Sequence, residues 1–135
     1  MDSKLNHSVN PLCFDTPGLF VALQESSSEH LDSLDFGVIG FDDAGIVCRY
    51  NATESRLAGL SASTVMGYHF FEVVAPCMNN FMVAEQFSDA LAAKTSMDCV
   101  LDYVLTLRMR PQRVKLRLLA MQDAAMRYVI VQRNL

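Results

Sequence analysis

The sequence predicts an α+β fold, in which a five-stranded antiparallel sheet has short helices on one face and an N-terminal cap. Three observations support this prediction: a strand hairpin, a central region with helical spacing and capping residues, and three consecutive strand-like segments at the end. This order of elements is typical of a sheet that is covered by helices on one side. The length of 135 residues, of which 51% are hydrophobic, suits one domain with a single core.

The hairpin is predicted from two runs of strand-forming residues, 36–41 and 46–50. Residues 42–45 separate these runs and contain the turn formers aspartate and glycine, which tolerate a positive φ. Asn51 follows the second strand and is expected to cap a short helix that contains Glu54. Strand, turn, strand and capped helix therefore follow one another within about twenty residues.

The longest helix is predicted at 81–93, where Phe81, Ala84, Phe87 and Leu91 recur at helical spacing and are expected to face the core. Three strands should follow, at 96–107, 110–121 and 126–133. In the middle strand Val114, Leu116 and Leu118 alternate with a basic set, which we interpret as a solvated sheet face: Arg113, Lys115 and Arg117.

Residues 1–30 are predicted to form an N-terminal cap, and residues 31–135 the core domain. Pro11, Pro17 and Gly18 interrupt regular structure in the cap, and the apolar stretch 19–23 is expected to form a short turn of helix.

Composition excludes several classes of function. The net charge of −4 gives no electrostatic basis for binding nucleic acid or an anionic membrane. No apolar run approaches the ~20 residues that span a bilayer, and the first residues lack the pattern of a signal peptide, so a cytoplasmic protein is expected. The four cysteines show no C-x-x-C spacing, which argues against structural zinc and favours reduced thiols.

The most informative residue is Cys77, which directly follows Pro76. Tyr50 and Glu54 lie upstream and are expected to converge with it on one pocket, which suggests a covalently held ligand. A free cysteine is more often a small core hydrophobe, and Tyr50 and Glu54 have equally ordinary readings as a strand-end aromatic and a solvated helix residue. The combination of the three favours a ligand site.

These residues resemble one branch of the PAS sensor domains, the photoactive yellow protein family. The order of strands and helices is that of a PAS domain, and the resemblance covers roughly residues 30–133. The matching stretches carry the local motifs: 34–37, 50–52 with Glu54, 65–67, 70–71, 74–77, Tyr103, and 109–111 with 114–115.

The resemblance implies a blue-light photoreceptor in which p-coumaric acid (4-hydroxycinnamic acid) is bound to Cys77 as a thioester. Tyr50 and Glu54 would hydrogen-bond its phenolate oxygen. Light would isomerise the chromophore, a proton would move from Glu54, and partial unfolding would be the signal. A buried carboxyl that stays neutral suits this role, because burial raises its pKa. The same resemblance implies that further residues line the site: Leu60, Phe70, Ala75, Pro76, Leu105 and Met109. Met109 would also aid the thermal return of the chromophore to its dark state.

Two positions depart from the family's pattern. Ala58 stands where the family has a threonine that bonds the tyrosine, and Leu60 stands where it has an arginine that shields the chromophore. Both changes make the pocket less polar, and the first should loosen Tyr50. We expect them to alter colour and kinetics but not attachment.

The same residues allow two other interpretations. A Cys77–His69 nucleophile lacks a base shown in contact and an oxyanion-hole motif, so no enzyme activity is expected. The alternative is a non-photoactive PAS module that binds another small ligand or a protein partner. The expected partner is a signalling protein that the sequence does not identify, and a homodimer through the cap stays open.

Overall fold

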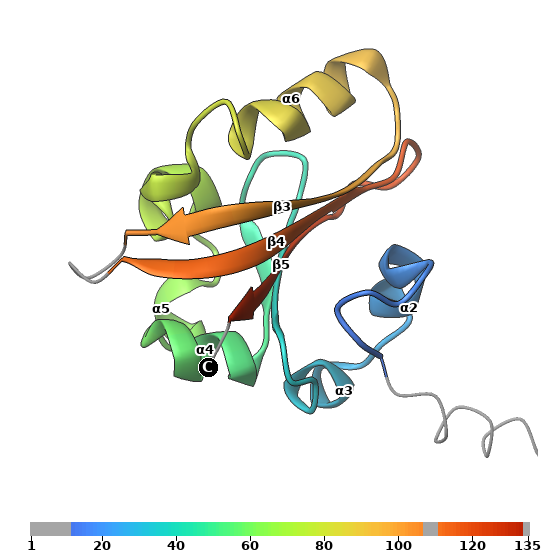
Figure 1. Ribbon diagram of the computed structural model, residues 1–135. Helices are drawn as coiled ribbons and strands as arrows, with labels where there is room; N and C mark the ends of the chain where they lie inside the picture. The colour runs from blue at the N-terminus through green and yellow to red at the C-terminus, as the bar shows by residue number, and fades with distance from the viewer. Residues whose placement is uncertain (1–11, 107–110, 134–135) are drawn as a thin grey trace, which may run out of the picture.

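The computed structural model describes residues 12–106 and 111–133, which form one antiparallel sheet with helices on both faces (Figure 1). The strands run in the order β2-β1-β5-β4-β3, so the last strand of the chain lies between β1 and β4. Their bounds are β1 Gly37–Phe41, β2 Val47–Tyr50, β3 Met97–Leu105, β4 Gln112–Ala120 and β5 Arg127–Arg133. The predicted α+β class, the five strands and the hairpin are confirmed.

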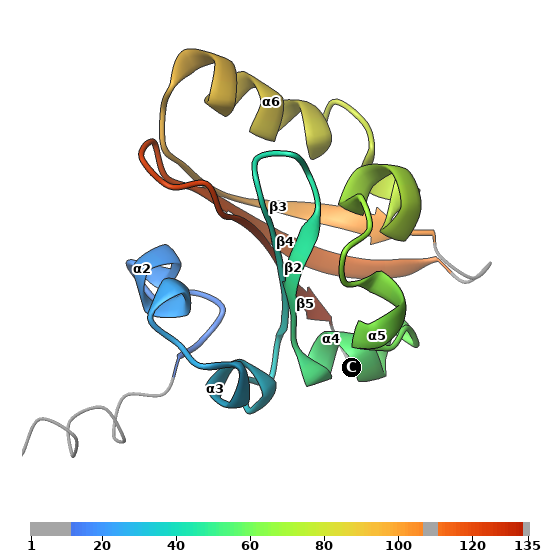
Figure 2. The same ribbon diagram turned by 180° about the vertical axis from the view of Figure 1, so that it is seen from behind.

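The helices fall into two groups on opposite sides of the sheet (Figures 1 and 2). The larger group comprises α4 Ala52–Ala58, α5 Ala62–Val65, a π-helical turn Phe70–Val74, a 3₁₀ turn Pro76–Met78 and α6 Ala84–Ala93. The smaller group is α2 Leu19–Gln24 and α3 Ser28–Asp32 from the N-terminal region. The short apolar helix predicted near residues 19–23 is therefore present.

Alternation along β5 divides the interior into two cores. Val129 and Val131 point into the larger core beneath α4 to α6, whereas Tyr128 and Ile130 point into a smaller core. The smaller core is completed by side chains of the N-terminal region such as Phe20. Because neighbouring residues of a strand face opposite sides, β5 is buried on both faces by two different parts of the chain.

The prediction that the longest helix begins at Phe81 was wrong. The helix α6 begins at Ala84, Phe81 is 70% exposed, and Leu91 is 52% exposed rather than core-facing. The side-chain oxygen of Asn80 accepts hydrogen bonds from the amides of Met82 (2.9 Å) and Val83 (3.1 Å). This turn holds the preceding residues out of the helix, and Phe87 remains the buried aromatic of α6.

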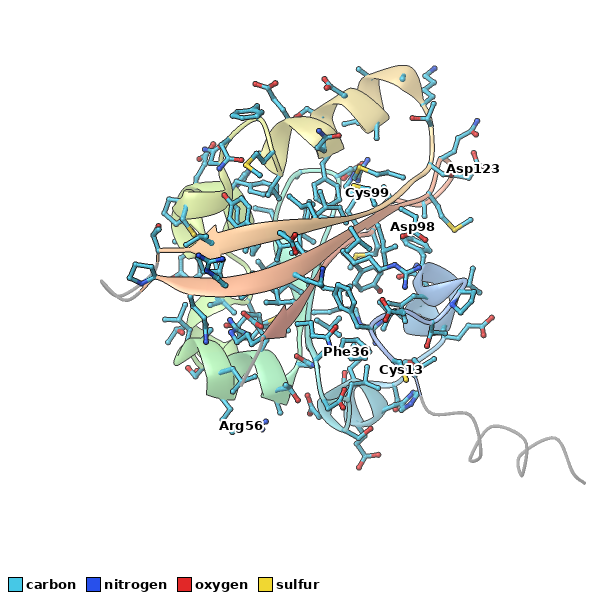
Figure 3. The ribbon with its side chains drawn as sticks, viewed as in Figure 1. Cys13, Phe36, Arg56, Asp98, Cys99 and Asp123 are labelled. Carbon is cyan, nitrogen blue, oxygen red and sulfur yellow. The ribbon has the colours of Figure 1, made fainter. Side chains whose placement is uncertain are left out.

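The prediction that Arg117 is solvated was also wrong, because the N-terminal region covers its part of the sheet. Its Nη1 donates to the carbonyls of Phe14 (2.8 Å) and Thr16 (2.9 Å). Its Nε and Nη2 bind both carboxylate oxygens of Asp98 at 2.8 Å. Asp98 and the adjacent Cys99 lie on opposite faces of β3 (Figure 3). Arg117 therefore fastens the cap to the sheet, while Arg113 and Lys115 are exposed as expected.

Replacing Asp98 with asparagine should weaken this attachment. The hydrogen bonds from Arg117 hold the pKa of the Asp98 carboxyl below its ordinary value, so its contribution is complete above the unfolded-state pKa and is lost as the pH falls through the lowered pKa. At neutral pH, Asp98→Asn should raise amide hydrogen exchange in residues 12–34 by roughly two- to tenfold, a range that allows for solvent screening of a half-exposed carboxylate.

The matched control is Asp102→Asn on the same strand, because Asp102 binds the exposed Lys115. This variant should leave exchange in the cap unchanged. Equal amide hydrogen exchange of residues 12–34 in the two variants would contradict the role given to Asp98. So would an exchange rate that still rises at acid pH in Asp98→Asn as it does in wild type.

Candidate functional site

Asn51 organises the start of α4, directly after Tyr50 at the end of β2. Its side-chain oxygen accepts from the amides of Val38 (2.9 Å) and Glu54 (3.0 Å). Its amide nitrogen donates to the carbonyls of Leu31 (2.8 Å) and Phe36 (3.0 Å). The predicted cap is confirmed, and Asn51 also joins α3, β1 and α4. This buried network fixes where the first turn of α4 begins, and with it the position of Glu54.

Glu54 is 4% exposed and lies between α4 and the sheet. Its Oε1 occupies the space that a Cβ at Gly37 would fill, so a glycine is required at that position of β1. A side chain at Gly37 would collide with the carboxylate, although the backbone of Gly37 has no unusual φ. The close approach holds the carboxyl group against β1.

The direct partner of Glu54 is Arg133, the last residue of β5. Its Nη1 and Nη2 bind the two carboxylate oxygens at 2.7 and 3.0 Å, across 79 positions of sequence. The end of β5 lies beside α4 in both ribbon views (Figures 1 and 2). Arg133 was not predicted as a site residue from the sequence, although its alternation with Val129 and Val131 indicates that it shares the face of the larger core.

Burial raises the pKa of the Glu54 carboxyl above its ordinary value, and the hydrogen bonds and charge of Arg133 oppose part of that rise. A guanidinium does not lose its proton in proteins. The bidentate geometry is therefore that of a carboxylate paired with a cation. Each carboxylate oxygen keeps further hydrogen-bonding capacity beyond its bond to Arg133.

Cys77 lies in the 3₁₀ turn and is half-buried. Its backbone carbonyl accepts from Tyr103 Oη (2.6 Å) and from Asn80 Nδ2 (3.1 Å), and these two groups also lie 2.6 Å apart. None of these bonds uses the thiol. The backbone of Cys77 is thus fixed to β3 and to the start of α6, while its sulfur is left for other contacts.

A cleft of about 650 Å³ opens beside Cys77. It lies against the ends of β3 and β4, where Tyr103 and Val114 are buried. Its remaining lining residues are Met82, Asp102, Val104, Thr106, Arg113 and Lys115. A half-buried thiol on the wall of a cleft is accessible to a small molecule, which suits a covalent ligand.

The structure places Tyr50 and Cys77 on the same core. Tyr50 is a member of the larger core, and Cys77 packs against its edge. Among the other predicted residues, Phe70, Ala75 and Leu105 are buried in this core, Leu60 packs against it from a half-buried position, and Pro76 is exposed. Met109 lies outside the described residues. These residues lie on one side of the sheet, with Glu54 beside the end of β5, but of the described ones only Cys77 lines the cleft.

Other sequence candidates have structural contacts. His69 Nδ1 accepts from the amide of Glu72 at 3.2 Å, and its ring fills the space beside Gly45. In residues 12–106 and 111–133, no group of three or more His, Cys, Asp or Glu side chains is placed to hold a metal ion. Within those same ranges, no helix has the length and apolar character needed to cross a bilayer.

Comparisons with known proteins agree with this architecture. The PAS fold family matches residues 22–132. A photoactive yellow protein from Halochromatium salexigens is 31% identical over 110 residues, or 82% of this chain and 87% of that protein. Another, from Rhodothalassium salexigens, is 31% identical over 97 residues, or 72% of this chain and 77% of that protein.

A solved structure gives the same result. The photoactive yellow protein domain of the sensor histidine kinase Ppr from Rhodospirillum centenum has a TM-score of 0.77 at 31% identity, and the match covers 84% of this chain and 98% of that one. The sheet order, the two groups of helices and the family match define a PAS domain. The chain belongs to the photoactive yellow protein family within the PAS fold. This membership points to a photosensory role.

Proposed function

We propose that this protein is a blue-light photoreceptor that holds a 4-hydroxycinnamoyl group as a thioester on Cys77. The observation that carries the proposal is the half-buried thiol on the wall of the 650 Å³ cleft, in a member of this family. When bound, the group would supply absorption of blue light and isomerisation. The residues present fit it, because a thiol, an apolar core and a buried carboxyl lie on one side of the sheet.

The residues of the chain have distinct parts in this proposal. Cys77 anchors the group while Tyr103 and Asn80 hold its backbone in place. Tyr50 and Glu54 serve the phenolic end, and Glu54 holds and releases a proton at a carboxyl oxygen. Loss of that proton moves negative charge onto a buried carboxylate that Arg133 binds, and the rearrangement of this buried polar group is the change that we propose to drive local unfolding.

The N-terminal cap is the segment that we propose to respond. Its backbone carbonyls are bound by two arginines of the sheet: Arg117, and Arg49, which donates to Leu23 (2.7 Å) and Ser26 (2.5 Å). Release of the cap would break these hydrogen bonds and would also expose the smaller core, which side chains of the cap complete. We propose that a signalling protein in the cytoplasm binds the changed form. This chain itself would have no enzyme activity.

The test is to combine the ligand-free protein with an activated p-coumaroyl ester and to record intact mass and absorption. We expect one added coumaroyl group and a visible band that bleaches under blue light and recovers in the dark. An unchanged mass, or a band that does not respond to light, would refute the photoreceptor.

The second candidate is a PAS module for another small ligand. Arg113 on the rim of the Cys77 cleft favours it, because its cation would suit an anionic group, whereas Lys115 on the same rim is paired with Asp102. Mass spectrometry of the natively purified protein separates the candidates, since a noncovalent ligand would support this one.

A further inference from the structure

We infer that Arg133 is a positioning residue that acts through Glu54: it is the counter-ion that fixes how many negative charges the phenolic end of the site contains. The inference rests on the proposed function for the identity of the ligand. The pairing of Arg133 with Glu54 is a feature of the protein itself and can be tested without any ligand.

Both side chains of this ion pair are buried. The side chain of Arg133 is 2% exposed and that of Glu54 is 6% exposed. Neither charge is solvated by bulk water, so each depends on the other for compensation. The guanidinium is always protonated, and the neutral arrangement of this pair therefore contains one negative charge on Glu54.

The orientation of the Arg133 guanidinium is fixed by its hydrogen bonds. Arg133 Nε donates to Gln112 Oε1 on β4 at 3.1 Å, while the other two nitrogens bind Glu54. Hydrogen bonds along different edges of the planar guanidinium fix its direction. Gly37 closes the space on the β1 side of the carboxylate. The cation is thus held in one place and does not follow the carboxylate as a flexible surface side chain would.

The phenol of the proposed ligand would lie beside Glu54. The carboxyl and the phenol would then form a coupled pair of acids next to one fixed positive charge. Arg133 stabilises one negative charge on this pair, so one proton is shared between the two groups. Without Arg133 both groups would favour their neutral forms, because two buried acids without a cation are poorly stabilised as anions. The arginine thus favours a singly ionised pair over a neutral one, so its removal should raise the pH at which the pair loses its first proton.

The test compares Arg133→Gln with wild type in two states. In the ligand-free protein, the Glu54 carboxyl is titrated by infrared or carbon NMR spectroscopy and assigned with Glu54→Gln. The proton affinity of Glu54 should rise at least tenfold in Arg133→Gln. In the protein loaded from an activated p-coumaroyl ester, the pH at which the yellow form gives way to the protonated phenol should move upwards by a similar factor.

Two further variants serve as controls. Arg133→Lys keeps the charge but loses the paired hydrogen bonds, and it should retain most of the wild-type titration. Arg127→Gln removes another buried arginine from the opposite end of β5, where Nη1 binds the carbonyl of Ala125, and should leave Glu54 unchanged. If Arg133→Gln does not fold, Arg133→Lys provides the test. Because this variant keeps the positive charge, a rise of tenfold or more in the proton affinity of Glu54 would overturn the counter-ion role.

The outcomes separate this inference from the proposed function. A shifted Glu54 titration in a protein that never becomes coloured supports the counter-ion and refutes the photoreceptor. A coloured protein in which Arg133→Gln changes neither titration supports the photoreceptor and overturns the counter-ion.

Discussion

Replacing Cys77 with alanine should abolish covalent attachment of the ligand completely. A thioester forms when the thiolate of Cys77 attacks the acyl carbon of an activated ester and the alcohol or thiol of that ester leaves, and alanine offers no nucleophile. The variant should fold, because the hydrogen bonds at this position use the carbonyl of residue 77 and not the thiol. Intact mass after reaction should therefore equal that of the unreacted variant, with no visible band.

The other thiols provide matched controls. Cys99 also packs against the larger core, and burial followed by the charge of Asp98 raises the pKa of its thiol. Cys48 is an exposed residue. Partial desolvation of its thiol, and then the negative charge of Asp42, raise the pKa of this thiol. Both Cys99→Ala and Cys48→Ala should react as wild type does. A labelled and coloured Cys77→Ala protein would refute the assignment of the anchor.

Replacing Asn51 with alanine should cause the largest loss of stability, about 3–5 kcal/mol in the free energy of unfolding. The variant removes four hydrogen bonds and leaves their buried backbone partners unsatisfied, at a cost of about 1–3 kcal/mol for each group that water does not reach. Because one of these partners is the amide of Glu54, the first turn of α4 should also exchange its amides faster. Urea unfolding and hydrogen exchange measure the two effects.

The matched control is Asn79→Ala. Asn79 is an exposed asparagine at the end of the 3₁₀ turn, so its loss should change stability by less than about 0.5 kcal/mol. An Asn51→Ala protein as stable as this control would show that the network around Asn51 contributes little.

Much of the fold could be predicted from interactions between residues that are close in sequence. The turn at residues 42–45 gives the hairpin, and the Asn51 side chain caps the helix that follows it. Alternation in β4 correctly places Val114, Leu116 and Leu118 in the core. The same pattern misplaced Arg117, because alternation tells which face a side chain takes but not which segment covers that face. Helical spacing likewise misplaced Phe81, because the bonds to Asn80 begin the helix later.

Part of the candidate site could be predicted from local sequence, and part could not. The motif before Cys77 and the nearby pair of Tyr50 and Glu54 are local features, and they were enough to suggest a ligand site. Glu54 was expected to be a neutral acid, whereas the structure pairs it with Arg133. Nothing close to Glu54 in the chain indicates that partner, which lies 79 positions away.

The sequence by itself determined the order of strands and helices, the turn, the helix cap and the thiol beside Pro76. These features depend on propensities, periodicity and hydrogen bonds that act over a few residues. The tertiary structure decided which charges meet, because β5 inserts between β1 and β4 and so brings Arg133 to Glu54. It likewise brought the N-terminal carbonyls to Arg117, since buried charges pair with whatever the packed chain places beside them.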